Sequence, residues 1–243
     1  MATSCKELKR IARENLTGHY KTPMGAFLMA SLITLAIELP FSMLLQSEYA
    51  TTFQTILYYV VDFLISLLGM VLSVGVSGIH LRLARQQEAA VPQMFGPIRT
   101  RPDRYLIAGF LKMVLTFAAV IPLGIGIAYA ILAPSVKATG IAVVLGLVSL
   151  VLAAYIELKL ALVFFLMLDD EALSPTRAFR LSASCMKHQM GRLLYLELSF
   201  IGMYLLGILS LGIGLLWVIP YRTQTLAQFY LDICKKVPQG DTF

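Results

Sequence analysis

Charged residues are scarce in this chain, and their scarcity argues against a soluble globular domain. Asp, Glu, Lys and Arg make up 14% of the 243 residues, whereas soluble domains carry about 25%. Hydrophobic residues make up 58%, and the mean hydropathy is +0.77. A soluble fold has no means of burying this much apolar surface. The composition therefore predicts a membrane protein.

Cysteine and histidine are also rare, which argues against a disulfide scaffold or a metal centre. The three cysteines form no C-x-x-C pair, and the three histidines show no H-E-x-x-H spacing. The sequence also lacks a phosphate-binding loop and the G-x-S-x-G turn of a serine hydrolase. We expect no metal, no cofactor and no enzymatic activity.

The net charge of +6 does not predict nucleic-acid binding, because no basic run is interleaved with aromatic residues that would stack on bases. In a membrane protein, an excess of Lys and Arg is typical of cytoplasmic loops, where these side chains also contact anionic lipids. We expect membrane lipids, and no nucleic acid, as partners.

Long apolar runs supply the elements of the fold. Each is long enough to cross about 30 Å of hydrocarbon as a helix. We predict an all-α membrane protein in which residues 1–243 form one domain. About six transmembrane helices are expected, at residues 24–45, 55–79, 105–132, 139–168, 193–209 and 215–233. Segment 139–168 is long for a single span, so it must tilt strongly or project from the bilayer.

A segment at the N-terminus, residues 4–18, has the pattern of an amphipathic helix. Ser4 and Glu7 occupy the positions of a capping box, and apolar residues then recur at helical spacing. We expect this helix to lie flat on the cytoplasmic surface of the membrane. An ordinary cytosolic helix that leads into the first span is the alternative.

A second amphipathic segment, residues 175–190, precedes the fifth span. Ser174 and Pro175 are a favourable N-cap and first residue, and Gly191 suits the far end. We interpret it as a cytoplasmic elbow helix that sets the angle at which the fifth span enters the membrane.

The distribution of Lys and Arg predicts the orientation. A cytoplasmic N-terminus places every Lys and Arg outside the spans on the cytoplasmic side, apart from Lys137. With six spans in the cytoplasmic membrane, both termini are then cytoplasmic. If the chain instead left the bilayer at Pro220, then Arg222, Lys235 and Lys236 would all be external, so this alternative is disfavoured.

Ionisable groups inside the spans are the candidates for a functional site, because a charge in hydrocarbon needs water or a partner. Glu38, Asp62 and Arg222 lie on the outer side of their span centres, whereas Glu157 lies toward the cytoplasm. These depths predict that Arg222 pairs with Glu38 or Asp62 rather than with Glu157.

A polar cavity between the first, second and sixth spans is therefore predicted. Its expected lining is Arg222, Glu38, Asp62, Thr223, Thr225 and Gln228. Such a cavity would bind an anionic headgroup or relay a proton. The alternative is a structural ion pair that fixes the register of the helices.

Small residues recur every four positions in the second span, at Gly69, Ser73 and Ser77. This spacing lets two helices approach closely. It does not distinguish a contact within the chain from a contact with a second copy or with another membrane protein.

Three stretches of the sequence resemble one known family. They are LKRIARENLTGHY at 8–20, AFRLSASCMKHQMGRL at 178–193 and LSFIGMYLLGILSLGIGLLWVIPY at 198–221, followed by Thr225 and Phe229-Tyr230. They resemble an uncharacterised family of bacterial integral-membrane proteins, typical of Gram-positive anaerobes and described as a domain of unknown function. That family usually has an uncharged residue in the place of Arg222. The resemblance implies a multi-span membrane protein and implies no activity.

Binding or transport of a lipid-like or small amphiphilic ligand is the function that these features favour. The alternative is a non-catalytic scaffold or accessory subunit of a membrane complex, which would contact its partner through the small-residue face of the second span. An intramembrane enzyme is disfavoured, because the motifs for a nucleophile or a metal are missing.

Overall fold

All secondary structure in the described part of the chain is helical. The computed structural model describes residues 3–45 and 51–234. In chain order its helices are α1 (Cys5–Leu16), α2 (Lys21–Leu45), α3 (Thr52–Ala84), the 3-10 helix η1 (Val91–Phe95), α4 (Gly96–Thr100), α5 (Pro102–Leu132), α6 (Val136–Lys159), α7 (Val163–Asp169), α8 (Pro175–Cys185), α9 (Met190–Leu198), α10 (Ile201–Leu209) and α11 (Leu215–Cys234). The prediction of an all-α protein is confirmed for these residues.

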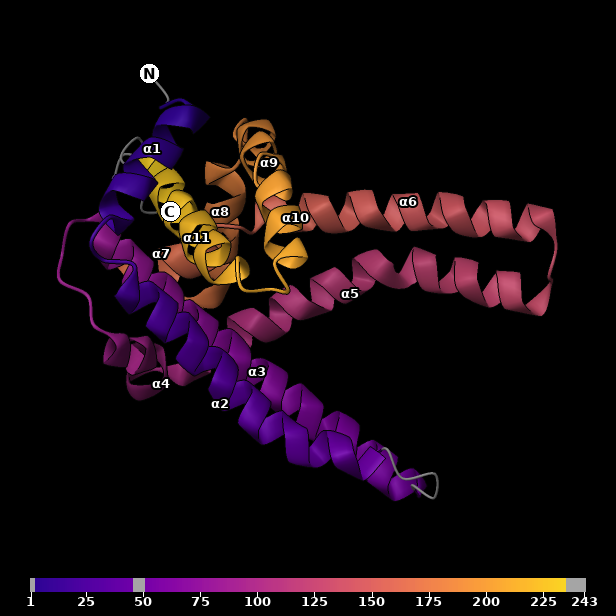
Figure 1. The fold of residues 1–243 in the computed structure, drawn as a ribbon. Helices are drawn as coiled ribbons and strands as arrows, with labels where there is room; N and C mark the ends of the chain where they lie inside the picture. Colours follow the sequence, from indigo (N-terminus) through magenta and orange to yellow (C-terminus); the bar gives the residue numbers. More distant parts are fainter. Residues whose placement is uncertain (1–2, 46–50, 235–243) are drawn as a thin grey trace.

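Two long helical hairpins extend in different directions from a compact body (Figure 1). One hairpin is formed by α2 and α3, and the other by α5 and α6. The body contains α1, α7, α8, α9, α10 and α11 together with the near ends of α3 and α5. The hairpins meet at this body, where α3 contacts α5, and diverge away from it.

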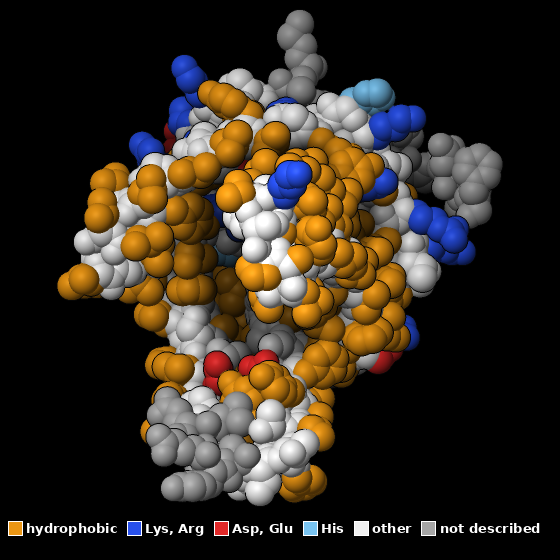
Figure 2. All heavy atoms as spheres, turned by 90° about the vertical axis from the view of Figure 1, so that its right-hand side faces the viewer, with side chains coloured by type: hydrophobic (Ala, Val, Ile, Leu, Met, Phe, Trp, Pro, Cys, Tyr) orange, Lys and Arg blue, Asp and Glu red, His pale blue; other side chains and the backbone are white. Residues whose placement is uncertain are grey.

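Five segments among the described helices are long and apolar enough to cross a membrane. They are Lys21–Met43, Thr52–Ala84, Pro102–Leu132, Val136–Asp169 and Met190–Leu209. Many of their large apolar side chains are exposed. Figure 2 shows hydrophobic side chains over most of one face, with Lys and Arg concentrated in its upper part. Exposed apolar surface of this extent indicates a membrane-embedded protein.

The sixth predicted span, 215–233, forms a helix with nearly these bounds, α11, but it is not among the five apolar segments. Its hydropathy is lowered by Arg222, Gln224 and Gln228. Helices α1, α2, α3 and α10 pack against it, and most of its second half is buried. Neighbouring helices, rather than lipid, thus cover much of α11, and the count of six spans stays a prediction.

Buried glutamines fix α11 against the end of α3. The side-chain amide of Gln224, which is fully buried, lies 2.8 Å from Nδ1 of His80. Gln228 donates a hydrogen bond from Nε2 to the carbonyl of Ala84 at 3.4 Å. Because buried polar side chains need partners, these contacts favour one register of α11 on α3.

Two of the predicted spans contain a break. A turn at residues 160–162 divides segment 139–168 into α6 and α7. The hydroxyl of Ser182 supports this turn, because it donates to the carbonyl of Lys159 at 2.9 Å and accepts from the N–H of Leu162 at 3.3 Å. The segment is therefore not one unbroken helix, although Val136–Asp169 as a whole is one of the five segments apolar enough to cross a membrane. Segment 193–209 is likewise divided into α9 and α10 at residues 199–200.

The elbow helix begins at Pro175 as predicted, but it ends at Cys185 rather than at residue 190. The turn that follows holds His188 at a φ of 69°, a left-handed conformation that is uncommon outside glycine. Gly191 lies inside α9 and does not end the elbow helix. The predicted stop at Gly191 is therefore wrong.

Helix α1 has the predicted N-cap Ser4, while the Glu7 side chain pairs with Arg10 rather than completing a capping box, and the helix packs differently from the expectation. The Ser4 hydroxyl accepts a hydrogen bond from the N–H of Glu7 at 3.2 Å. The apolar face, with Leu8, Ala12 and Leu16 at most 2% exposed, belongs to the core of the body, where α1 packs against α11. The apolar face of α1 was expected to enter the lipid. In the structure α11 covers this face instead.

The two ends of the described chain meet in the body. The hydroxyl of Thr3 donates to Oδ1 of Asp232 at 2.7 Å, and Arg192 pairs with Oδ2 of Asp232 at 2.6 Å. Residues 3 and 232 must therefore lie on the same side of any membrane that the hairpins cross.

Candidate ligand-binding cleft

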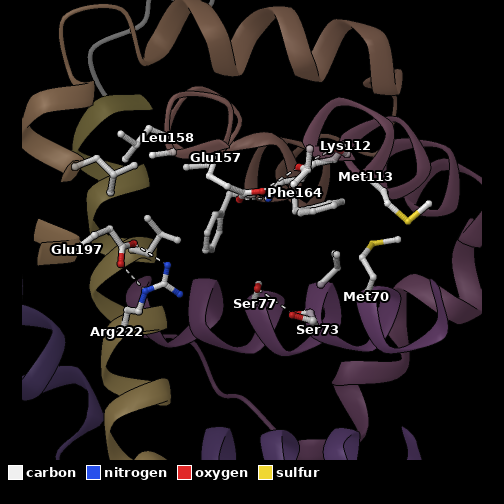
Figure 3. Close-up of a pocket in the computed structure, with 18 of the residues that line it drawn as sticks. Met70, Ser73, Ser77, Lys112, Met113, Glu157, Leu158, Phe164, Glu197 and Arg222 are labelled. Carbon is white, nitrogen blue, oxygen red and sulfur yellow. Dashed lines mark hydrogen bonds and ion pairs between the residues drawn. The ribbon is translucent and has the colours of Figure 1, made fainter. Parts of the chain in front are cut away.

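A cleft of about 740 Å³ lies where the two hairpins diverge from the body. Helix α3 lines one side and α5 and α6 line another, while α9 and α11 close the end (Figure 3). Its walls combine apolar side chains with two ion pairs. The larger apolar residues around it include Met70, Met113, Leu158, Phe164 and Leu193.

The first ion pair joins Arg222 of α11 to Glu197 of α9. Nε and Nη2 of Arg222 donate to the two carboxylate oxygens at 2.6 and 2.8 Å. This two-point geometry is the strong form of an arginine–carboxylate contact. Both side chains keep partial exposure, 38% for Arg222 and 27% for Glu197, so they can be reached from the cleft.

The second ion pair joins Lys112 of α5 to Glu157 of α6. Nζ of Lys112 lies 2.7 Å from Oε2 of Glu157, and the hydroxyl of Thr116 approaches the other carboxylate oxygen at 3.4 Å. In Figure 3 this pair lies on a different wall from Arg222 and Glu197. Ser73 and Ser77 lie on the α3 side, between Arg222 and Met70 and across the cleft from Lys112 and Glu157.

The predicted pairing of Arg222 with Glu38 or Asp62 is wrong, because the structure pairs it with Glu197. Arg222 lies at the level of Ser73 and Ser77, with which it lines the cleft. Asp62 is about 16 Å further along α3 than Ser73, at 1.5 Å per residue. Neither Glu38 nor Asp62 lines the cleft, and both lie further toward the tip of the α2–α3 hairpin.

A second cavity, of about 320 Å³, lies between α2, α3 and α11, the three helices at the predicted polar cavity. We call it the α2 cavity. Arg222 and Thr223 line it as predicted, whereas Glu38 and Asp62 do not. Gln228 contacts the end of α3 instead, and Thr225 is fully buried and donates to the carbonyl of Tyr221 at 2.8 Å.

The small-residue face of α3 is used within the chain. A Cβ placed on Gly69 would lie 3.1 Å from Cγ2 of Thr34, so glycine here permits the close approach of α2. Ser73 and Ser77 line both the cleft and the α2 cavity. Contact with a partner protein through this face stays a prediction.

A scan against protein-family models matches residues 1–237 to the family described as "Protein of unknown function (DUF975)". The chain belongs to the DUF975 family. The match confirms the resemblance to a family of unknown function that the sequence indicates. No curated protein and no solved structure matches the chain. For this DUF975 protein, the chemistry of the cleft is therefore the guide to function.

Glu197 is the residue of this DUF975 cleft that sequence reasoning missed. It lies in the first turns of the predicted span 193–209, where a carboxylate is easily taken for a residue of the membrane boundary. The sequence held a signal for the contact between Glu197 and Arg222, because the predicted spans 193–209 and 215–233 are consecutive and therefore antiparallel. Counted from the connection at 210–214, the depths of Glu197 and Arg222 along the helix axes differ by only about 8 Å.

The two ion pairs determine what the cleft can hold. Each pair balances its own charge, so the cleft does not attract ions of one sign strongly. Each pair also presents a cation and a carboxylate beside apolar walls. The arrangement suits a molecule with an apolar part and a polar head that carries both donors and acceptors.

Proposed function

We propose that this DUF975 protein binds a lipid-like amphiphile in the cleft, with its polar head at the ion pairs. The observation that carries the proposal is the placement of two ion pairs in one mainly apolar cleft, at the base of two lipid-facing hairpins. Because the hairpins diverge from the body, a lipid chain can enter between them without crossing the body. Binding is the first step of either storage or transport.

Replacing the Arg222–Glu197 pair by two methionines tests this proposal. Removing both partners leaves no unpaired charge, so we expect the double variant R222M/E197M to fold. Native mass spectrometry of the purified protein, incubated with dioleoyl phosphatidylethanolamine, would measure lipid retention. We expect retention to fall about tenfold, since hydrogen bonds to charged groups contribute about 1.5–3 kcal/mol.

A matched control is the variant R10M, which breaks an exposed arginine network on α1, away from the cleft. It should retain lipid as the wild type does. Full retention in the double variant would contradict the proposal. Loss of folding in the double variant would instead support the alternative of a pair that fixes helix register.

We also propose that both termini are cytoplasmic. Lys137 lies at the tip of the α5–α6 hairpin, whereas the described Lys and Arg residues that precede α3 and follow α7 lie in or beside the body. This distribution supports an orientation with the body inside.

Labelling of introduced cysteines tests this orientation. In a chain whose three native cysteines are replaced by serine, K137C should react with an impermeant maleimide in intact cells. E88C, which is exposed in the loop after α3, should react only after the cells are opened. The reverse pattern would contradict the proposed orientation.

A further inference from the structure

Arg222 borders two cavities rather than one. It lines the cleft on the side of α5 and α6, and it also lines the α2 cavity. Ser73 and Ser77 of α3 are shared in the same way. The α2 cavity is thus a side chamber next to the point at which the head of a bound amphiphile would meet Arg222.

Hydroxyl groups dominate the polar lining of this chamber. Five of its eleven lining residues are Ser or Thr, namely Ser31, Thr34, Ser73, Ser77 and Thr223. Four of these donate their proton to a backbone carbonyl of their own helix. The distances are 2.9 Å from Ser31 to Phe27, 3.1 Å from Thr34 to Ala30, 3.0 Å from Ser77 to Ser73 and 2.9 Å from Thr223 to Ile219.

A hydroxyl that donates to its own helix keeps its oxygen lone pairs as acceptors. The chamber therefore offers acceptors on α2, α3 and α11, and it offers donors mainly from Arg222. A group that complements this wall must carry O–H or N–H donors. Arg222 has N–H donors beyond the two that bind Glu197 from Nε and Nη2, and a phosphate oxygen can accept from them.

We propose that the α2 cavity selects the head of the bound molecule, which is a phosphate linked to a group with O–H or N–H donors. The phosphate contacts Arg222, and an ammonium or hydroxyl group extends to the oxygens of Thr34, Ser31 and Thr223. This inference rests on the proposed function, and it names the class of ligand as a phospholipid with a donor-bearing head.

A comparison of two lipids with the same chains tests the inference. Dioleoyl phosphatidylethanolamine carries three N–H donors, whereas dioleoyl phosphatidylcholine carries a quaternary ammonium without any. We expect native mass spectrometry of the protein with an equal mixture to show at least about a fivefold preference for the ethanolamine lipid, because even one hydrogen bond changes an equilibrium several-fold.

Removing the hydroxyls should abolish this preference while the lipid is still bound. Valine has the shape of threonine without its oxygen, so in the variant T34V/T223V retention of the ethanolamine lipid should fall to the level of the choline lipid, whose retention should not change. The control T139V removes an exposed hydroxyl with the same backbone contact, from Thr139 to Ser135 on α6, and should keep the preference. If T34V/T223V does not fold, S31A supplies the same test.

Each outcome has a separate meaning. A wild-type protein that retains no lipid overturns both the proposed function and this inference. Lipid retention with no preference, or with a preference that the valine variant keeps, overturns this inference alone.

Added phosphoethanolamine distinguishes the two sources of the head. If it displaces the lipid at millimolar concentration, the chamber binds the free head, and if it does not, the chamber requires the lipid.

Discussion

The variant G75A is expected to lose about 3 kcal/mol of stability, because overpacking a tight core site costs roughly 1–3 kcal/mol and backbone overlap falls at the upper end. A Cβ on Gly75 of α3 would overlap the backbone carbonyl group of Met94 in η1. The backbone of Met94 cannot rotate away as a side chain can. The Met94 side chain is itself fully buried in the main core, so η1 has to shift as a unit.

The neighbouring glycine on the same helix provides the control. A Cβ on Gly78 would lie 3.5 Å from Cδ2 of Leu168, which is an ordinary contact. Because alanine is favoured over glycine inside a helix by about 1 kcal/mol, G78A should be neutral or stabilising. Thermal unfolding of the two variants in the same detergent measures the difference. Equal melting temperatures would show that η1 does not pack on α3 at Gly75.

The hairpin helices could be predicted from the sequence because hydropathy alone defines them. Residues 105–132 were predicted as a span, and α5 runs from Pro102 to Leu132. The first two spans agree in the same way with α2 and α3, although α3 continues to Ala84. Such helices face lipid on most sides, so their composition carries nearly all of the information about them.

The body could not be predicted to the same degree, because the packing and the ends of its helices depend on contacts between segments that are far apart in the sequence. Helix α1 has the same amphipathic pattern whether its apolar face meets lipid or α11. The break between α6 and α7 depends on Ser182, which comes twenty residues after Leu162 in the chain. The partner of Arg222 likewise depends on how α9 and α11 are packed, and span depth alone selected the wrong carboxylates.

The variant D232A is expected to lose about 3–5 kcal/mol, the usual cost of removing one partner from a buried ion pair. Asp232 and Arg192 are only 12% and 16% exposed. Arg192 also stacks on the ring of Phe229 at 5.0 Å, and its Nε is buried without a hydrogen-bond partner among the described residues. Removal of the carboxylate therefore leaves a guanidinium that can neither reach water freely nor find an equivalent acceptor.

An exposed pair of the same type gives the control. Arg101 and Asp103 lie 3.9 Å apart, with side chains 63% and 62% exposed. Since exposed pairs contribute about 0–1 kcal/mol, D103A should unfold at nearly the wild-type temperature. A D232A protein as stable as D103A would show that the Arg192 contact does not hold the ends of the chain together.

A double variant separates two contributions to stability: the cost of leaving Arg192 buried without its carboxylate, and the stabilisation that the ion pair itself provides. In R192M/D232L both charges are gone and apolar groups replace them, so we expect most of the lost stability to return. The contacts of Thr3 with Asp232 and Arg192 do not return, because leucine accepts no hydrogen bond and methionine donates none. The first residues of the chain should then be cleaved faster by protease than in the wild type, although the core of the double variant is stable. Restored stability together with a loosened N-terminus would show that Arg192 and Asp232, which both hydrogen-bond to Thr3, fasten the start of the chain to the body.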